Sequence, residues 1–306
     1  MYGYFYNRVG NNALMAIYKN GTYIIIYVYY IMSVTPLFSR IGNKSKIYSI
    51  LARYFPKEIE TFAEPFAGSG AALLRTPPQK YTKGVLNDID KMLIKANKFV
   101  KSYKGTEADI EKDFKLIVLK ETTEEARLAK WTMIINKLNK RTKSLTPKEA
   151  FMYMILAKLT FGSKVVVPNN TVKLYKDMNI GKFLKNRLFK YRDRLNEKNV
   201  VLSSSDYKTV LKKYNKPNTF FFIDPPYENS GNMYGKDSAI DLEQLASLLK
   251  DMEANFMLTL NDSPNIRKLF SGFKMRKLVV PGGSANVKTS STIGGTNRKE
   301  LIITNY

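Results

Sequence analysis

A carboxylate, two prolines and a tyrosine directly follow an apolar run in the stretch FFFIDPPYENS, residues 220–230. Proline has no N–H to donate within a sheet, so the run Phe220–Ile223 predicts a short buried strand that stops at Asp224. The prolines fix two φ angles and hold the Asp224 carboxylate and the Tyr227 ring in a set relation. Ligands of open α/β sheets bind outside the carboxyl ends of the strands, so this loop is a candidate site. A turn that only ends the strand is the alternative.

A glycine loop and an acid form a second pattern that could do chemistry. AEPFAGSGA, residues 63–71, follows a predicted strand and opens a predicted helix. Gly68 and Gly70 permit close backbone approach, and the helix N-terminus adds outward N–H groups. About 20 residues on, LNDID places Asp88 and Asp90 at the end of a second strand, where an acid typically accepts hydrogen bonds from the ribose of an adenosyl cofactor. The phosphate-loop spacing that ends in GK[ST] is missing, so ATP hydrolysis is not expected.

The composition limits the classes of binding partner and of chemistry that are expected. Among 306 residues, 50 are Lys or Arg and 26 are Asp or Glu, which gives a formal net charge of +24. This excess favours a polyanionic partner, with nucleic acid ahead of a membrane surface, and a lysine bias for solubility is the alternative. Cysteine and histidine are both absent, which excludes disulfides, Cys/His zinc sites and histidine-dependent triads. We expect no metal, and chemistry that uses carboxylates, lysines, tyrosines, backbone groups or a cofactor.

Strand and helix patterns alternate in the two outer parts of the chain but not in its middle. TFAEPF, AGSG and AALLRT indicate strand, glycine loop and helix, and GVLNDID followed by KMLIKANKFVKSY repeats the pattern. Such alternation predicts a doubly wound, mostly parallel α/β sheet. The middle of the chain shows basic, amphipathic helical stretches instead. We therefore predict a split α/β domain over residues 33–102 and 199–306, a basic helical insertion over 103–198, and an N-terminal extension of unknown role over 1–32.

The uncharged segment TYIIIYVYYIM, residues 22–32, is the most apolar part of the N-terminal region. It is too short to cross a bilayer as a helix, which needs about 20 residues. The following residues lack the small-residue pattern of a signal-peptide cleavage site. We predict a buried or edge strand here, and a soluble intracellular protein that is cytoplasmic or nucleoid-associated.

Taken in order, AEPFAGSGA, LNDID and DPPY resemble the Dam-like adenine-N6-specific DNA methyltransferases, which use S-adenosylmethionine. PLFSRIGNKSKI, residues 36–47, is similar to the N-terminal motif Pro-x-x-x-Trp-x-Gly-Gly-Lys of that family. SSSDY resembles the Asp-Phe step before the catalytic loop, and NFMLTLNDSP and NRKELIITNY resemble two later strand motifs. The resemblance covers residues 33–100 and 200–306. It implies a Rossmann-like class I methyltransferase fold and a site-specific DNA-methyltransferase acting on adenine.

The resemblance also implies roles for individual residues. The cofactor-binding set comprises Arg40, Gly42, Lys44, Glu64, Phe66, Gly68, Gly70, Asp88, Asp206, Tyr207 and Asp224, and the catalytic set comprises Asp224, Pro225, Pro226 and Tyr227. Lys44, with Gly42 and Arg40, would hold the methionine end of the cofactor. Asp88 would bind the ribose hydroxyl groups, and Asp206 with Tyr207 would contact the adenine. The tryptophan of the family is Arg40 here, which alters the packing around the methionine chain. Its second glycine is Asn43, which tolerates left-handed φ better than most residues.

The chemistry implied by the resemblance explains the DPPY loop. The 6-amino group of adenine is a poor nucleophile because its lone pair is conjugated into the ring. The Asp224 carboxylate and the Pro225 carbonyl would bind its protons and favour a lone pair that points at the methyl group. A base inside a duplex is out of reach and must be flipped out. Tyr227 would then stack on the extruded ring, a contact worth ~1–3 kcal/mol at similar sites.

The basic middle segment supplies candidate phosphate contacts. They are Arg127, Lys137, Lys140, Arg141, Lys164 and the cluster from Lys182 to Arg194, which includes Lys185 and Arg187. A solvated helix face is the alternative for any single member. Candidate base readers are Asn136, Asn139, Arg141 and Asn170, because Asn and Arg are the usual readers. We expect double-stranded DNA as partner, no membrane, a monomer or weak dimer, and a cognate restriction endonuclease as an open question.

Other functions remain open from the sequence. An RNA base-amino methyltransferase shares the glycine loop and a similar Pro-Pro-aromatic loop, and the positive charge suits RNA equally well. Enzymes that methylate the amino group of cytosine more often carry Ser in place of Asp224, and protein-glutamine methyltransferases more often carry Asn. A non-catalytic DNA-binding protein on a decayed methyltransferase fold is favoured only by Arg40. The intact Asp224 and glycine loop oppose decay.

Overall fold

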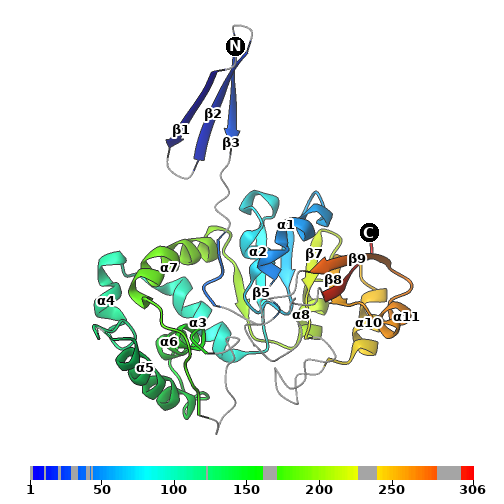
Figure 1. Cartoon of the computed structure of the whole chain (residues 1–306). Coiled ribbons are helices and arrows are strands. Elements are labelled where there is room, and N and C mark those ends of the chain that lie inside the picture. Colours follow the sequence, from blue (N-terminus) through cyan, green and yellow to red (C-terminus); the bar gives the residue numbers. More distant parts are fainter. Residues whose placement is uncertain are drawn as a thin grey trace, which may run out of the picture. The chain divides into compact units, whose positions relative to one another are not determined.

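The structure is a computed structural model, and the chain divides into two units, residues 1–34 and 35–306 (Figure 1). It describes residues 3–9, 12–19, 22–28, 34–38, 42, 44–121, 123–160, 171–226, 240–280 and 298–306. The predicted site residues Arg40, Lys164 and Tyr227, together with Asn43 and Asn170, lie outside the described residues.

The N-terminal unit is an antiparallel sheet of three strands in the order β1-β2-β3. The strands are β1 (Gly3–Val9), β2 (Asn12–Lys19) and β3 (Thr22–Val28). β3 pairs with β2 from Thr22 opposite Lys19 to Val28 opposite Ala13. The strand predicted within residues 22–32 is therefore confirmed, and it is an edge strand of this sheet.

The larger unit is built on a seven-stranded sheet with the order β6-β5-β4-β7-β8-β10-β9. The strands are β4 (Thr61–Glu64), β5 (Lys83–Asn87), β6 (Val201–Ser203), β7 (Thr219–Ile223), β8 (Asn255–Asn261), β9 (Lys274–Val280) and β10 (Arg298–Thr304). β6, β5, β4, β7 and β8 run parallel, whereas β10 pairs antiparallel with both β8 and β9. The predicted mostly parallel α/β sheet is confirmed. The chain leaves β4 toward β5 and β6 and then returns to β7, so the strand order reverses between β4 and β7.

Helices cover both faces of the sheet and bury β7 completely. Phe221 and Ile223 face α8 (Tyr207–Tyr214), α10 (Leu242–Lys250) and α11 (Pro264–Leu269), where they join Leu245 and Phe256 in one apolar cluster. Phe220 and Phe222 point to the opposite face because successive side chains of a strand alternate. There they meet Phe55, whose ring centre lies 4.9 Å from that of Phe220. A strand buried on both faces is apolar throughout, which is the pattern seen in its sequence.

The remaining elements between residues 44 and 109 are mostly short. They are the 3-10 turns η1 (Lys44–Lys46), η2 (Ala52–Tyr54), η3 (Pro78–Lys80) and η4 (Glu107–Asp109), and the helices α1 (Tyr48–Leu51), α2 (Ala71–Arg75) and α3 (Lys91–Ser102). Strand β5 ends at Asn87, earlier than the predicted Asp90. The reason is local: the Asp90 carboxylate accepts hydrogen bonds from the N–H groups of Met92 and Leu93, which makes it the N-cap of α3.

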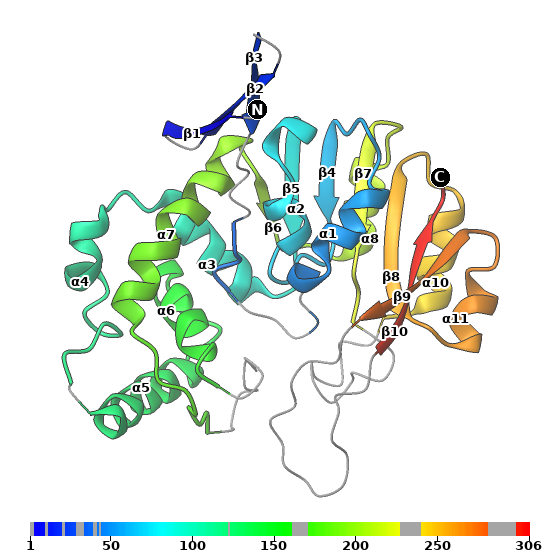
Figure 2. The same ribbon diagram turned by 45° about the horizontal axis from the view of Figure 1, so that its top comes forward.

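Helices occupy the chain between β5 and β6. After α3 come α4 (Ile110–Asp113), α5 (Glu124–Asn139), α6 (Pro147–Ala157) and α7 (Ile180–Glu197), which gather beyond the β6 edge of the sheet (Figure 2). α3 contacts α6 and α7, and α5 contacts α6. These elements are helical, and the basic helical insertion as such, with its boundaries, stays a prediction.

Arg194 of α7 joins the helical segment to the sheet domain. Its side chain is buried and donates hydrogen bonds to the carbonyl oxygens of Leu73, Leu74 and Thr76 at the end of α2. It also contacts the hydroxyl group of Tyr81. These carbonyls lie at the negative end of α2, where a cation is favoured. Arg194 therefore points inward and is not exposed, in contrast to the phosphate contact predicted for the Lys182–Arg194 cluster.

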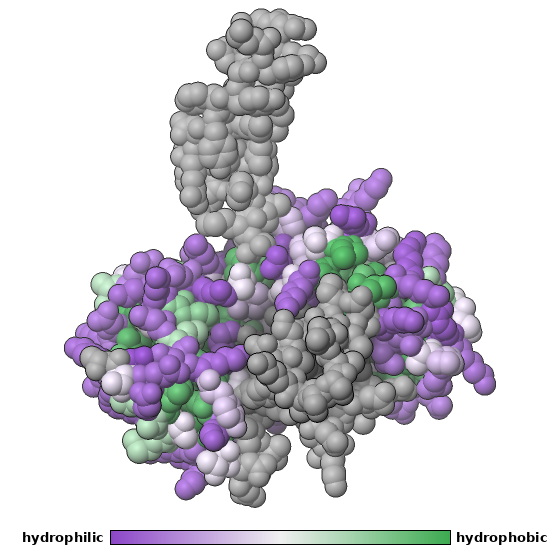
Figure 3. Space-filling view, viewed as in Figure 1, coloured by the Kyte–Doolittle hydropathy of each residue, from purple (hydrophilic) through white to green (hydrophobic). Residues whose placement is uncertain are grey.

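The surface matches the strongly charged composition. Figure 3 shows hydrophilic residues over much of the visible face, both on the surface of the helical segment and around the α10–α11 end of the sheet domain. Within the described part of the chain, no helix is both long and apolar enough to cross a membrane. The same residues contain no group of three or more His, Cys, Asp or Glu side chains arranged to hold a metal ion.

Candidate active site

The carboxyl ends of β4 and β7 meet where the strand order reverses, the place at which open α/β sheets bind ligands. β4 ends in Glu64 and leads into the glycine loop, whereas β7 leads into Asp224, Pro225 and Pro226. The side chain of Asp224 is 21% exposed, and Pro225 is buried. The apolar strand predicted to stop at Asp224 is confirmed, and the two motifs lie next to each other at one edge of the sheet.

The Asp224 carboxylate is held from two sides. Nζ of Lys44, at the start of η1, lies 2.8 Å from Oδ1 of Asp224. The hydroxyl group of Thr259, in the adjacent strand β8, donates a 2.7 Å hydrogen bond to the same oxygen. Lys44 is buried and also lies 3.6 Å from the carboxylate of Glu300 in β10. The arrangement fixes the orientation of Asp224 before any ligand arrives.

Gly42 supports Lys44 from the same N-terminal motif. Its backbone has a φ of 80°, in the left-handed region that glycine adopts without steric cost. Its carbonyl oxygen lies 3.4 Å from Nζ of Lys44 and accepts a hydrogen bond from it. The structure thus brings Gly42 and Lys44 of the Pro36–Ile47 motif to the Asp224 loop, and their contact with a cofactor stays a prediction.

The glycine loop is tied to the acid that follows β5. Gly68 and Gly70 both have left-handed φ angles, of 49° and 66°. A Cβ on Gly70 would lie 3.0 Å from the Leu74 side chain and would be strained by the left-handed φ, so both the space and the backbone favour glycine there. The N–H of Gly68 donates a 2.8 Å hydrogen bond to Oδ2 of Asp88, which also accepts the N–H of Asp90 through Oδ1. Asp88 is therefore placed at the mouth of the loop.

Glu64 is buried behind the loop and caps a helix. Its Oε1 atom accepts a 2.6 Å hydrogen bond from the N–H of Leu73 in the first turn of α2. Its pKa is raised to about 8, chiefly by burial; the Leu73 hydrogen bond opposes this shift and the charge of Asp224 adds to it. Much of Glu64 is therefore protonated near neutral pH. This contact shows how Glu64 shapes the glycine loop, and its direct contact with a cofactor stays a prediction.

Aromatic residues line the third side of the site. The rings of Phe66 and Tyr207 lie 5.0 Å apart at an angle of 33°. Asp206, which precedes Tyr207, accepts the N–H of Lys208 and caps α8. Burial, followed by the charges of Asp206 and Asp241, raises the pKa of Tyr207, so this ring keeps its proton across the physiological range.

Asn87 holds the loops after β4, β5 and β6 together, a role that the sequence did not reveal. Its side-chain NH₂ donates to the carbonyl oxygens of Pro65 and Ser205. Its oxygen accepts from the hydroxyl group of Ser203 and the N–H of Ser205. The position directly before Asp88 is the signal that could have found it. Ile89, next to Asp88, is 69% exposed and places an apolar side chain at the same edge.

Thr259 and Glu300 were also not predicted from the sequence. Both belong to strands whose motifs looked structural, and neither carries a local signature. Only the sheet order places β8 beside β7, and β10 beside β8. A polar residue within an otherwise apolar strand is the weak signal that was present.

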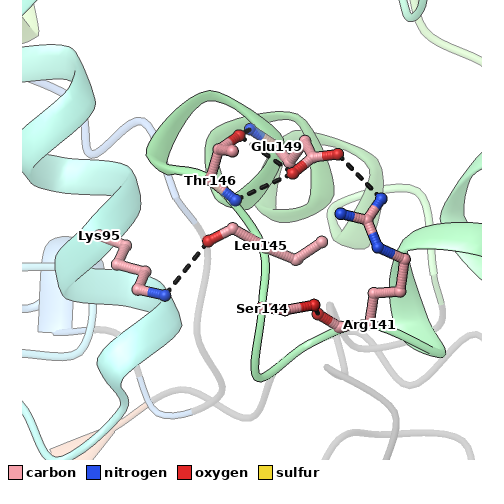
Figure 4. A network of polar contacts seen from close by, with 6 residues as sticks. All are labelled: Lys95, Arg141, Ser144, Leu145, Thr146 and Glu149. Carbon is pink, nitrogen blue, oxygen red and sulfur yellow. Dashed lines mark hydrogen bonds and ion pairs between the residues drawn. The ribbon is translucent and has the colours of Figure 1, made fainter.

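The predicted base readers and phosphate contacts of the helical segment fall into two groups. Several are already bonded within the protein. Asn136 exchanges two hydrogen bonds with the backbone of Val172, and buried Asn139 accepts one from Tyr153. Arg127 pairs with Asp177. Arg141 pairs with Glu149 in the network of Figure 4, where Glu149 also closes the capping box of α6 with Thr146.

The second group is more accessible. Lys137, Lys140 and Lys182 are exposed, and Lys185 is partly exposed and pairs with Glu111. Arg187 and Lys158 both lie over the ring of Phe183, at 5.2 and 5.3 Å from its centre. Burial and the nearby charges of Arg187 and Lys176 lower the pKa of Lys158 to about 8. Lys158 and Arg187 thus share the Phe183 ring, and the charge of Lys176 lies nearby. A group of three cations of this kind is suited to bind a polyanion. Lys158 was not predicted.

The fold and site define a class. A mostly parallel seven-stranded sheet, with a glycine loop after β4 and an Asp-Pro-Pro loop after β7, is the α/β fold of class I methyltransferases. Residues 41–279 match the family described as D12 class N6 adenine-specific DNA methyltransferase. The chain belongs to this family, so the resemblance seen in the sequence is confirmed, and the protein is an adenine-specific DNA methyltransferase. No curated protein gave a significant match to the chain.

Proposed function

We propose that the enzyme transfers a methyl group from S-adenosylmethionine to the 6-amino group of an adenine that has been flipped out of double-stranded DNA into the Asp224 loop. The observation that carries this proposal is the position of Asp224. It lies at the carboxyl end of β7, beside the glycine loop of β4, with its orientation fixed by Lys44 and Thr259. This is the reversal point of the sheet, where a cofactor and a substrate can meet.

The residues at this edge fit an adenosyl cofactor. Gly68 and Gly70 have no side chains, so a ligand can approach the backbone closely at these two positions, and the Asp88 carboxylate at the mouth of the loop suits ribose hydroxyl groups. Phe66, Ile89 and Tyr207 offer apolar contact for a purine. When bound, S-adenosylmethionine supplies a methyl group on a positively charged sulfur. Lys44 and Gly42 would hold its methionine end, together with Arg40.

Asp224 would act as a hydrogen-bond acceptor for the target base. Lys44 and Thr259 both contact Oδ1, so we assign Oδ2 to the amino group of the target adenine, with the Pro225 carbonyl as the second acceptor. Two acceptors on the N–H protons turn the nitrogen lone pair away from ring conjugation and toward the methyl group. Holding the reacting atoms at ~3–3.5 Å is then the main contribution of the protein. Tyr227 would stack on the flipped base.

The helical segment would bind the DNA backbone. Lys158 and Arg187 around Phe183, with exposed Lys137 and Lys182, offer a basic surface built from α5, α6 and α7. Phosphate contacts position a protein on DNA, while base contacts select its sequence. Asn136 and Asn139 are bonded internally, so we assign base reading to other residues.

The test is methyl transfer from labelled S-adenosylmethionine to unmethylated genomic DNA, with structured RNA in parallel. We expect label in DNA as N6-methyladenine. Asp224→Asn should lower the rate by about 10²–10³-fold, because the amide keeps the size of the carboxylate but loses its charge. Asp251→Asn, the same change at an exposed carboxylate after α10, is the matched control and should leave the rate unchanged. Label in RNA alone, or full activity of Asp224→Asn, would overturn the proposal.

A further inference from the structure

Three charged side chains from distant parts of the chain form a buried cluster at the candidate site. Nζ of Lys44 lies 2.8 Å from Asp224 and 3.6 Å from Oε2 of Glu300. The side chains of Lys44 and Glu300 are only 6% and 2% exposed. Burial removes most of the water that would screen these charges, so they act strongly on one another and on any charge brought close to them.

The strand register places Glu300 at this cluster. Glu300 of β10 lies opposite Asn261 of β8, two residues from Thr259. Residues paired across strands, and residues two apart along a strand, share one face of a sheet. Thr259, Asn261 and Glu300 therefore share the face on which Thr259 bonds to Asp224. Glu300 lies outside the residues that match the family.

The cluster contains more hydrogen-bond acceptors than the Lys44 ammonium group satisfies. Oε2 of Glu300 and Oδ1 of Asn261 are buried, and neither accepts a hydrogen bond within the described part of the chain. The 3.6 Å separation from Lys44 is too long for a hydrogen bond. Buried acceptors of this kind usually have a donor or a positive charge nearby, so the site is suited to receive one.

The formal charges of the cluster do not cancel. Among the residues that the structure describes, one ammonium group and two carboxylates leave one negative charge in excess. Neighbouring Glu64 adds little to this near pH 7, because burial raises its pKa to about 8. A buried site with one excess negative charge is a site for a cation.

We propose that Glu300 is a positioning residue that holds Lys44 against Asp224 and gives the cluster its excess negative charge, so that the site favours the positively charged methyl donor over its demethylated product. This inference rests on the proposed function. Asp224 holds the amino group, and methyl transfer needs the reacting atoms within ~3–3.5 Å, so the sulfonium charge would lie within about 8 Å of the cluster. At that separation, and with an effective dielectric constant of about 30, one unit of charge changes affinity about tenfold.

The test compares the binding of S-adenosylmethionine and S-adenosylhomocysteine, which differ by a methyl group and a positive charge, to the full-length protein by calorimetry at pH 7. Glu300→Gln keeps the shape of the side chain and removes the excess charge. We expect the preference for S-adenosylmethionine to fall about tenfold relative to the wild type. Lys44→Gln changes the cluster in the opposite sense and should raise this preference, even if both affinities fall. Glu253→Gln, at the opposite end of β8 and exposed, is the control and should leave the preference unchanged.

Damage to the fold lowers both affinities together and leaves their ratio unchanged, so the ratio reports charge rather than structure. Thermal unfolding identifies any variant that does not fold. If one of Glu300→Gln and Lys44→Gln does not fold, the affinity ratio of the other tests the inference. An unchanged ratio in folded Glu300→Gln and Lys44→Gln would overturn the inference while leaving the proposed function intact. A wild-type protein that binds neither ligand would overturn the proposed function itself.

Discussion

The backbone N–H of Gly68 donates a 2.8 Å hydrogen bond to the Asp88 carboxylate, which connects the glycine loop after β4 to the acid after β5. The left-handed backbone of Gly68 aims its N–H at that acid. Asp88 thus serves two purposes in the proposed function. It shapes the loop in the free protein, and its carboxylate is the candidate acceptor for ribose hydroxyl groups.

Asp88→Ala should therefore weaken the binding of S-adenosylmethionine by about 10–100-fold, because hydrogen bonds to a charged group are worth about 1.5–3 kcal/mol. Calorimetric titration measures this change. Asp90→Ala is the comparison, because Asp90 caps α3 and should instead cost about 1 kcal/mol of stability with cofactor affinity nearly unchanged. Equal loss of affinity in both variants would contradict a ribose contact at Asp88.

Glu64→Gln should change how stability depends on pH. Burial and the charge of Asp224 raise the folded-state pKa of Glu64 from 4.5 to about 8. Between these values the folded protein binds more protons than the unfolded chain, so the contribution of Glu64 to stability is full below pH 4.5 and is lost as pH rises toward 8. Glutamine keeps the acceptor for Leu73 and does not titrate.

Urea unfolding at pH 5 and pH 8 measures this effect as a difference between the two proteins. The free energy of unfolding should fall by more in the wild type than in Glu64→Gln, with a slope difference of at most about 1.4 kcal/mol per pH unit. Parallel pH dependence in the two proteins would show that Glu64 has an ordinary pKa.

Lys158 should make DNA binding depend on pH above neutrality. Its pKa is lowered to about 8 by burial and by the charges of Arg187 and Lys176, so it loses its proton between pH 7 and 9. The loss of one phosphate contact weakens binding by at most about tenfold at ~0.1 M salt. Lys158→Arg should bind duplex DNA with a flatter pH dependence, because arginine stays charged.

Fluorescence anisotropy with an unmethylated duplex at fixed salt measures this affinity. In the same assay, Arg187→Ala should reduce the slope of log affinity against log salt by about 0.9 if Arg187 contacts one phosphate. Identical pH profiles for the wild type and Lys158→Arg, with an unchanged salt slope for Arg187→Ala, would remove this cluster from the DNA surface.

Arg194→Met should destabilise the protein without weakening DNA binding electrostatically. The substitution removes the Arg194 donor from the carbonyl groups of Leu74 and Thr76, whereas the Leu73 carbonyl keeps the N–H of Thr76. Each buried group left unsatisfied costs about 1–3 kcal/mol. We expect a loss of about 3 kcal/mol or more in the free energy of unfolding by urea. The salt slope of DNA binding should stay at the wild-type value, and a smaller slope with unchanged stability would show that Arg194 contacts phosphate.

Local patterns were sufficient for the strands and loops that carry the motifs. The run Phe220–Ile223 predicted a buried strand because apolar residues before two prolines leave few alternatives, and β7 confirms it. The alternation of strand, glycine loop and helix predicted a mostly parallel sheet, in which β4 and β5 are parallel neighbours. β9, which was not predicted, is an edge strand of alternating exposure whose pairing with β10 depends on residues far from it in sequence.

Side chains of the same type proved harder to separate by role. Arg194 and Arg187 belong to one basic run, yet Arg194 is buried against α2 and Arg187 is partly exposed beside Phe183. Asn139 looked like a base reader and is bonded to Tyr153 inside the helical segment. Helical periodicity shows which residues share a face, but not which faces of α5, α6 and α7 are covered.

The sequence by itself determined the class of protein, because glycine, proline and carboxylate impose their backbone and chemical constraints locally and in a fixed order along the chain. The tertiary structure alone decided the surroundings of Asp224. Lys44, Thr259 and Glu300 come from separate elements and meet only because the strand order reverses between β4 and β7 and because β10 pairs with β8. Charge interactions depend on distance and burial, and both of these are properties of the folded chain.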